Sequence, residues 1–271
     1  MTDYYPPQQT APYPTNGSSM PNQPPPPYYP NSNNVSIPAQ EQFTSDAFSD
    51  KAVRRAFIRK VYLILALQLT ITLGIVCIFT FVPVIKDGVR RYYWIYYLSY
   101  AIFLVTYILL GCFVQCRRRF PTNIICLFVF TLALSYMAGT ISAFHRIEAV
   151  LIALIMTILL CLAITLFAIQ TRWDFTVCSG FILVASVCVF LVGMACLIVN
   201  FTLGTNRVLQ AVYAGLVLLL FGFMLVYDTQ QVVGGRKYEL DEEEYVFGAM
   251  QLYVDVVMIF VALLGLSGSQ Y

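Results

Sequence analysis

The sequence predicts an all-α membrane protein, in which a bundle of seven transmembrane helices follows a disordered N-terminal tail rich in proline and tyrosine. Hydrophobic residues make up 59% of the 271 residues and charged residues only 11%, whereas a soluble domain has about 25% charged residues. The few charges also divide the chain into long uncharged blocks. A net charge of +2 is too small to indicate a nucleic-acid-binding protein.

Seven blocks are long enough to be membrane spans. Six of them carry no charged residue and cover residues 61–85, 92–116, 120–144, 149–171, 175–206 and 208–227. Each has about 20 residues or more, enough to cross roughly 30 Å of hydrocarbon at about 1.5 Å per residue. A seventh block, 245–266, is interrupted only by Asp255. Long unbroken apolar runs favour helices over the alternating strands of a membrane barrel.

The first fifty residues have a different composition, which predicts two regions: a disordered cytoplasmic tail over 1–50 and a membrane domain over 51–271. The tail is rich in Pro, Tyr, Asn, Gln and Ser, and it cannot bury enough apolar surface to fold. Within it, Pro26, Pro27 and Tyr29 fit the pattern Pro-Pro-x-Tyr, a ligand for WW-type domains. The alternative is a solvated spacer in which the match arises by chance.

The distribution of basic residues predicts the orientation. Eleven Lys and Arg residues precede the first span or lie in even-numbered loops, and five lie in odd-numbered loops. Because the more basic side of a membrane protein faces the cytoplasm, we expect a cytoplasmic N-terminus.

Asp255 is the most informative residue, because a carboxyl group within an apolar span is unfavourable. It is the tenth residue of a span that starts near Val246, which places it roughly 13 Å below the cytoplasmic surface. A charge at that depth costs at least about 2.5 kcal/mol. We therefore expect Asp255 to face the bundle interior and to have a partner or to be protonated.

The sixth span supplies a partner, Asp228, which approaches the same side of the membrane. The last two spans share a short loop and are expected to be neighbours. Two carboxylates in a pocket of low dielectric cannot both ionise cheaply, so we expect Asp228 and Asp255 to share a proton and to sense pH. When ionised, they offer oxygen ligands suited to Ca²⁺. The alternative is one buried Asp satisfied by hydroxyl groups and one boundary Asp in water.

The other polar groups indicate less. The run Asp241, Glu242, Glu243 and Glu244 is either a cation funnel at a pore mouth or a solvated helix start. One histidine and the absence of paired cysteine spacing do not indicate a zinc site, a disulfide scaffold or a His-based catalytic arrangement. We therefore expect neither an enzyme nor a cofactor.

Four separate segments resemble the Bax inhibitor motif-containing family. They cover residues 57–72, 117–144, 226–230 (VYDTQ) and 242–260, and the Pro/Tyr-rich head is similar to the Lifeguard branch. The resemblance implies a seven-helix fold, endoplasmic-reticulum or Golgi membranes, a pH-sensitive Ca²⁺ leak and suppression of apoptosis. It also implies Ca²⁺ as the permeant ion, and the lipid bilayer, protons and apoptosis-regulating membrane proteins as partners.

The resemblance further implies roles for individual residues. In that family, an aspartate pair acts as pH sensor and gate, and the matching positions in this sequence are Asp228 and Asp255. A basic residue from an early helix latches one aspartate in the family, and the candidates here are Arg117, Arg118 and Arg119.

Three other functions remain open from the sequence. Tyr227-Asp228 matches one half of an intramembrane aspartyl protease, but the Gly-x-Gly that should precede the second aspartate is replaced by Leu252-Tyr253-Val254. A proton-coupled cation exchanger would use the same two carboxyl groups. A membrane adaptor would act through the N-terminal tail.

Overall fold

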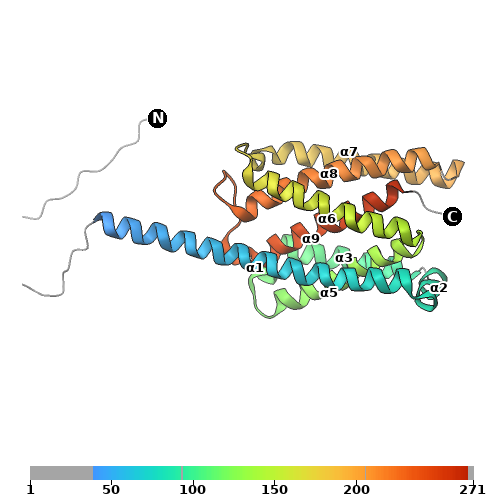
Figure 1. The fold of residues 1–271 in the computed structure, drawn as a ribbon, viewed down its shortest axis with the longest axis horizontal. Helices are drawn as coiled ribbons and strands as arrows, with labels where there is room; N and C mark the ends of the chain where they lie inside the picture. Colours follow the sequence, from blue (N-terminus) through green and yellow to red (C-terminus); the bar gives the residue numbers. More distant parts are fainter. Residues whose placement is uncertain (1–38, 93, 205, 268–271) are drawn as a thin grey trace, which may run out of the picture. The chain divides into compact units, whose positions relative to one another are not determined.

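The computed structural model of the chain describes residues 39–92, 94–204 and 206–267, and these form a set of helices (Figure 1). The contacts discussed below all lie within the unit Ser45–Tyr271. The long helices are α1 (Ala39–Phe81), α3 (Trp94–Cys112), α5 (Thr122–Ala143), α6 (Ile147–Gln170), α7 (Ser179–Leu203), α8 (Arg207–Val233) and α9 (Tyr245–Leu266). The short ones are α2 (Pro83–Arg91), α4 (Val114–Arg118), η1 (Phe175–Cys178) and η2 (Glu242–Glu244).

Seven helices in the described part of the chain are long and apolar enough to cross a membrane, which confirms the predicted fold class. The boundary of the first span differs from the sequence prediction. The first span ends at Phe81, because Pro83 has no backbone N–H and starts the separate helix α2. The sixth span continues beyond residue 227 to Val233, so Asp228 lies inside the helix.

The first helix, α1, is described from Ala39 onward. The boundary between a tail over 1–50 and a membrane domain over 51–271 stays a prediction. The Pro-Pro-x-Tyr segment with Pro26, Pro27 and Tyr29 lies outside the described residues.

Helix α2 closes the end of the bundle where α1 ends. Arg90 donates from Nε and Nη2 to the carbonyl of Ala143 at 3.0 and 2.7 Å, and Lys86 donates to the carbonyl of His145 at 3.4 Å. These carbonyl groups lie at the C-terminal end of α5, where no helical donor is available. The basic residues of α2 therefore cap α5.

Helix α9 is the central helix of the bundle. About 61% of its apolar span is buried, against 56% for α5 and 6% for α7. It contacts α8, α6 and α5, and it runs between α5 and α6 in Figure 1. The most exposed span, α7, presents apolar side chains such as Phe190 and Leu191 to the surroundings, as expected of a lipid-facing helix.

One face of α9 carries a hydrogen-bond network that joins three helices. The hydroxyl of Tyr253 lies 2.8 Å from Thr72 Oγ1 and 3.1 Å from Ser135 Oγ, and it donates to the carbonyl of Thr131 at 3.2 Å. Gln68 Nε2 donates to Thr131 Oγ1 at 2.9 Å. Buried hydroxyl groups are unfavourable unless they are hydrogen-bonded, so this network fixes α1 and α5 against α9.

Tyr253→Phe is expected to destabilise the protein by about 1–2 kcal/mol, because loss of the hydroxyl group leaves its buried partners without a hydrogen bond. Thermal unfolding of the purified protein in detergent measures the effect. Tyr92→Phe, at a half-exposed ring, is the control and should leave the melting temperature unchanged. Equal melting temperatures for all three proteins would contradict this role of Tyr253.

Candidate functional site

Asp228 on α8 and Asp255 on α9 lie together in the interior of the bundle. Their exposed fractions are 2% and 1%. The two carboxyl groups are within reach of a side-chain hydrogen bond to each other. Because an ionised carboxylate is only an acceptor, such a bond requires that one of the two groups keeps its proton.

The connection between α8 and α9 explains how the two aspartates meet. Gly234 has a φ of +77° and Gly235 a φ of +72°, a backbone conformation that favours glycine and ends α8 sharply. The chain then returns, and the N–H of Leu240 donates to the carbonyl of Gln231 at 3.1 Å. At Gly248 an added Cβ would lie 3.2 Å from a methyl group of Val232, so the absence of a side chain allows α8 and α9 to pack closely.

Gln251 is a member of the site that the sequence analysis missed. Its Nε2 donates to Asp228 Oδ1 at 3.1 Å. Gln251 and Asp255 are four residues apart on α9, and this spacing puts two side chains on one face of a helix. That spacing was the sequence pattern that could have identified Gln251.

Within the described residues, no basic side chain forms an ion pair with either aspartate. Tyr107 of α3 and Cys161 of α6 are near enough to interact electrostatically with Asp255. No third acidic side chain, histidine or cysteine joins the pair in a metal-binding group within the same residues.

The three latch candidates lie away from the aspartate pair in this structure. Arg117 Nη2 pairs with Glu244 Oε1 at 2.6 Å, and Arg118 pairs with Asp241, Glu243 and Glu244 at 2.8, 3.0 and 3.0 Å. Arg119 is exposed and forms no ion pair within the described part of the chain. Glu244 precedes Asp255 by three turns of helix, roughly 16 Å. The short helix α4 thus holds Arg117 and Arg118 at the start of α9, too far away to latch the aspartate pair.

The same ion pairs bind most of the acidic run. Asp241, Glu243 and Glu244 are bound by arginine, and Glu242 is exposed. The hydrogen bond to Glu244 raises the pKa of Arg118 above its ordinary value, so Arg118 stays charged. In this conformation the run is a closed ion-pair cluster and not a ring of free carboxylates.

Comparison with known proteins places the chain in a family. The family profile described as "Inhibitor of apoptosis-promoting Bax1" matches residues 54–270. The chain belongs to the Bax inhibitor and Lifeguard family. Protein lifeguard 3 of Homo sapiens is 42% identical over 236 residues, and that of Mus musculus is 43% identical; both alignments cover 85% of this chain and 76% of the relative. Bax inhibitor 1 of Schizosaccharomyces pombe is 30% identical over 94% of both chains.

The family resemblance of the four sequence segments is thereby confirmed. This Lifeguard-family chain is a multi-pass integral membrane protein, and the description of its family links it to the inhibition of apoptosis.

Asp174 connects two loops at the end of the bundle where α9 begins. Its Oδ1 accepts from Thr176 Oγ1 at 2.6 Å and from the N–H of Thr176 at 3.0 Å, and its Oδ2 accepts from the N–H of Lys237 at 3.0 Å. These hydrogen bonds, that from the Thr176 hydroxyl most of all, lower the pKa of Asp174 below its ordinary value of 3.8. The loop after α6 is thus tied to the loop between α8 and α9.

Asp174→Asn is expected to lower stability at neutral pH and to flatten its acid dependence. A carboxyl group whose pKa is lowered by folding stabilises the protein above its ordinary value, and this stabilisation is lost as pH falls through the folded value. The wild-type melting temperature should therefore fall faster than that of the variant below about pH 4. Parallel melting curves from pH 7 to pH 3 would contradict this role of Asp174.

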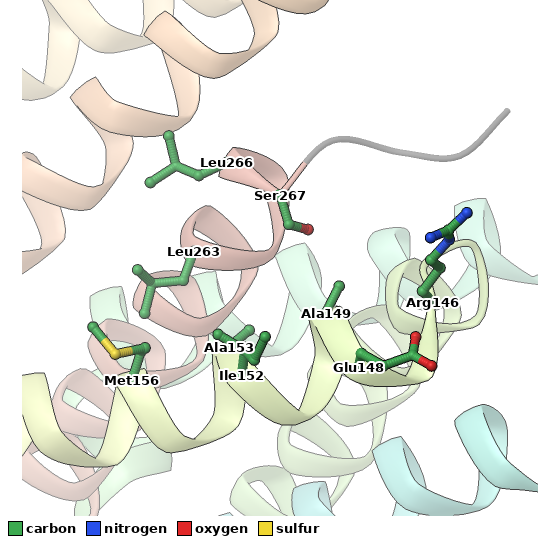
Figure 2. Close-up of a pocket in the computed structure, with 9 residues that line it drawn as sticks. All are labelled: Arg146, Glu148, Ala149, Ile152, Ala153, Met156, Leu263, Leu266 and Ser267. Atoms are coloured by element: carbon green, nitrogen blue, oxygen red, sulfur yellow. The ribbon is translucent and has the colours of Figure 1, made fainter.

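Among the described residues, α9 borders a larger and a smaller cavity. One, of about 440 Å³, lies where α9 ends, between apolar side chains such as Ile152 and Leu263, with Arg146 and Glu148 on its polar side (Figure 2). The other, of about 210 Å³, lies between α1, α6 and α9, and its lining residues on α9 are Val256, Val257 and Phe260. At about 100° per residue, these side chains lie on a different face of α9 from Asp255.

Proposed function

We propose that this family member is a pH-sensitive calcium leak channel of intracellular membranes, in the endoplasmic reticulum or Golgi, with a cytoplasmic N-terminus. It would modulate calcium stores and so suppress apoptosis. The observation that carries the proposal is a pair of buried carboxyl groups, Asp228 and Asp255, which lie within hydrogen-bond reach of each other and form no ion pair with any described residue. The family description and the name Bax inhibitor 1 support the link to apoptosis.

The closed state depends on the shared proton. A hydrogen bond between Asp228 and Asp255 holds α8 against α9, because a protonated carboxyl donates to an ionised one. Removing that proton leaves two like charges in contact, and adding a second proton removes the charge that strengthens the bond. Either change, or occupancy by Ca²⁺, shifts a closed-to-open equilibrium.

The residues along α9 suggest a route for the ion. The acidic run stands where α9 begins, and Gln251 and Asp255 follow on one face of the helix. Opening would separate Arg117 and Arg118 from the acidic run, whose carboxylates would then attract cations at the mouth.

We infer a non-enzymatic role, since Leu252-Tyr253-Val254 replaces the Gly-x-Gly that a membrane aspartyl protease would need. A proton-coupled cation exchanger is the second candidate, because a carboxyl pair that shares a proton can also carry one. A membrane adaptor that acts through residues 1–50 is the third candidate.

Calcium flux into dye-loaded liposomes that contain the purified protein distinguishes these functions. A leak channel conducts Ca²⁺ down its gradient without a proton gradient, and its flux varies with pH. Flux that requires an opposing proton gradient would favour the exchanger. If deleting residues 1–50 abolished the cellular function and Asp255→Asn did not, the adaptor would replace both.

A further inference from the structure

We propose that Gln251 is a third oxygen ligand of a cation site that it forms with Asp228 and Asp255, and that it also positions Asp228. This inference rests on the proposed function, because it names a ligand of the same gate. Amide and carboxylate oxygens are the ligands that hard cations such as Ca²⁺ take in proteins.

The hydrogen bond that Gln251 donates fixes the position of its side chain. Nε2 donates to Asp228 Oδ1 at 3.1 Å. An amide that donates through its nitrogen directs its oxygen away from that acceptor. Oε1 of Gln251 is therefore turned away from Asp228, on the face of α9 that also carries Asp255.

Two unpartnered oxygens provide the second observation. Apart from the proton that Asp255 shares with Asp228, Gln251 Oε1 and Asp255 Oδ2 are buried and have no hydrogen-bond partner among the described residues. Asp255 is 1% exposed. Buried acceptors without donors are unfavourable in a folded protein, and a cation or the water that it carries would satisfy both oxygens.

The charges around the site favour a cation over an anion. The pair provides carboxyl groups from α8 and α9, and Tyr107 of α3 and Cys161 of α6 are near enough to interact electrostatically with Asp255. Arg117 and Arg118 are bound to the acidic run, and Arg54 is bound to backbone carbonyl groups at the end of α8. No third acidic side chain among the described residues joins the pair in a metal-binding group. The amide oxygen of Gln251 is therefore the third ligand of the proposed site.

Gln68 is a matched control on the opposite side of α9. Its Nε2 also donates to a buried side chain, Thr131, at 2.9 Å, and its Oε1 is also buried without a partner. It belongs to the Tyr253 network and not to the aspartate pair. Loss of Gln68 should thus disturb packing as loss of Gln251 does, without touching the cation site.

The test is the rise in melting temperature that added CaCl₂ produces in the detergent-solubilised full chain, which gives an apparent Ca²⁺ affinity. Gln251→Leu should weaken that affinity by about tenfold or more. Gln251→Glu, which keeps an oxygen and adds a charge, should bind Ca²⁺ at least as tightly as the wild type. Gln68→Leu should lower the melting temperature without Ca²⁺ and leave the affinity unchanged.

Wild-type affinity in both Gln251→Leu and Gln251→Asn would overturn the inference, and so would equal losses of affinity in Gln251→Leu and Gln68→Leu. Gln251→Glu and Gln251→Asn carry the test if Gln251→Leu does not fold. Asp255→Asn separates the two proposals. If it abolishes Ca²⁺ stabilisation and the Gln251 variants do not weaken it, only this inference fails. If Asp255→Asn also leaves it unchanged, the proposed gate fails as well.

Discussion

Replacing Asp255 by Asn is expected to reduce calcium flux through the reconstituted protein by about tenfold or more. Asn has the shape of Asp, and its amide donates to Asp228 as a protonated Asp255 would. Loss of a proton can no longer break the contact between α8 and α9, so the closed state persists. The cation site also loses one of its two carboxyl groups. The initial rate of dye response in liposomes measures the effect.

Asp228→Asn should give the same loss of flux, since either carboxyl group can be the acceptor of the shared proton. Asp87→Asn is the matched control, because Asp87 is an exposed acid on α2, away from the pair. It should conduct like the wild type. Wild-type flux in both pair variants, with correctly folded protein, would show that the pair is not the gate.

Arg54→Ala is expected to destabilise the fold by about 3 kcal/mol, the largest stability effect of a single replacement that we predict. Arg54 Nη1 donates to the carbonyl of Leu240 at 2.6 Å, Nη2 to that of Gln231 at 2.8 Å and Nε to that of Val233 at 3.3 Å. These three carbonyl groups end α8 and begin the return to α9. Without Arg54 these carbonyl groups lose charge-assisted hydrogen bonds, and α1 is no longer hydrogen-bonded to this loop through Arg54.

Thermal unfolding in detergent measures that loss. Arg55→Ala is the control, because Arg55 is the exposed neighbour of Arg54 on α1 and should change the free energy of unfolding by less than about 0.5 kcal/mol. Gly234 provides an independent check. A Cβ at Gly234 would lie 2.6 Å from Arg54 Nε, and its φ of +77° already disfavours other residues. Gly234→Ala should therefore also lower the melting temperature, and two stable variants would contradict this role of the loop.

The spans could be predicted from sequence because charges and apolar runs act locally. The free-energy cost of a carboxyl group in lipid predicted an interior position for Asp255. The short loop between the last two spans predicted Asp228 as its neighbour. The break at Pro83 was also accessible, since proline cannot continue the hydrogen-bond ladder of α1. The pattern Gln251-x-x-x-Asp255 was visible too, but an amide carries no charge to draw attention to it.

Other features depend on three-dimensional packing. The partners of Arg117 and Arg118 are set by the place where α4 ends beside η2, and the sequence contains several acidic residues that would have fitted equally well. The Tyr253 network joins residues far apart in the chain, with Thr72 on α1 and Ser135 on α5. No local spacing identifies such partners.

The shared proton of Asp228 and Asp255 is tested most directly by the calcium flux of wild-type and variant proteins across a pH series, in liposomes with equal pH on both sides. We expect the wild-type rate to change with pH and the rates of Asp228→Asn and Asp255→Asn to be low and independent of pH. Variants that retain the wild-type pH dependence would contradict a gate built on these two carboxyl groups.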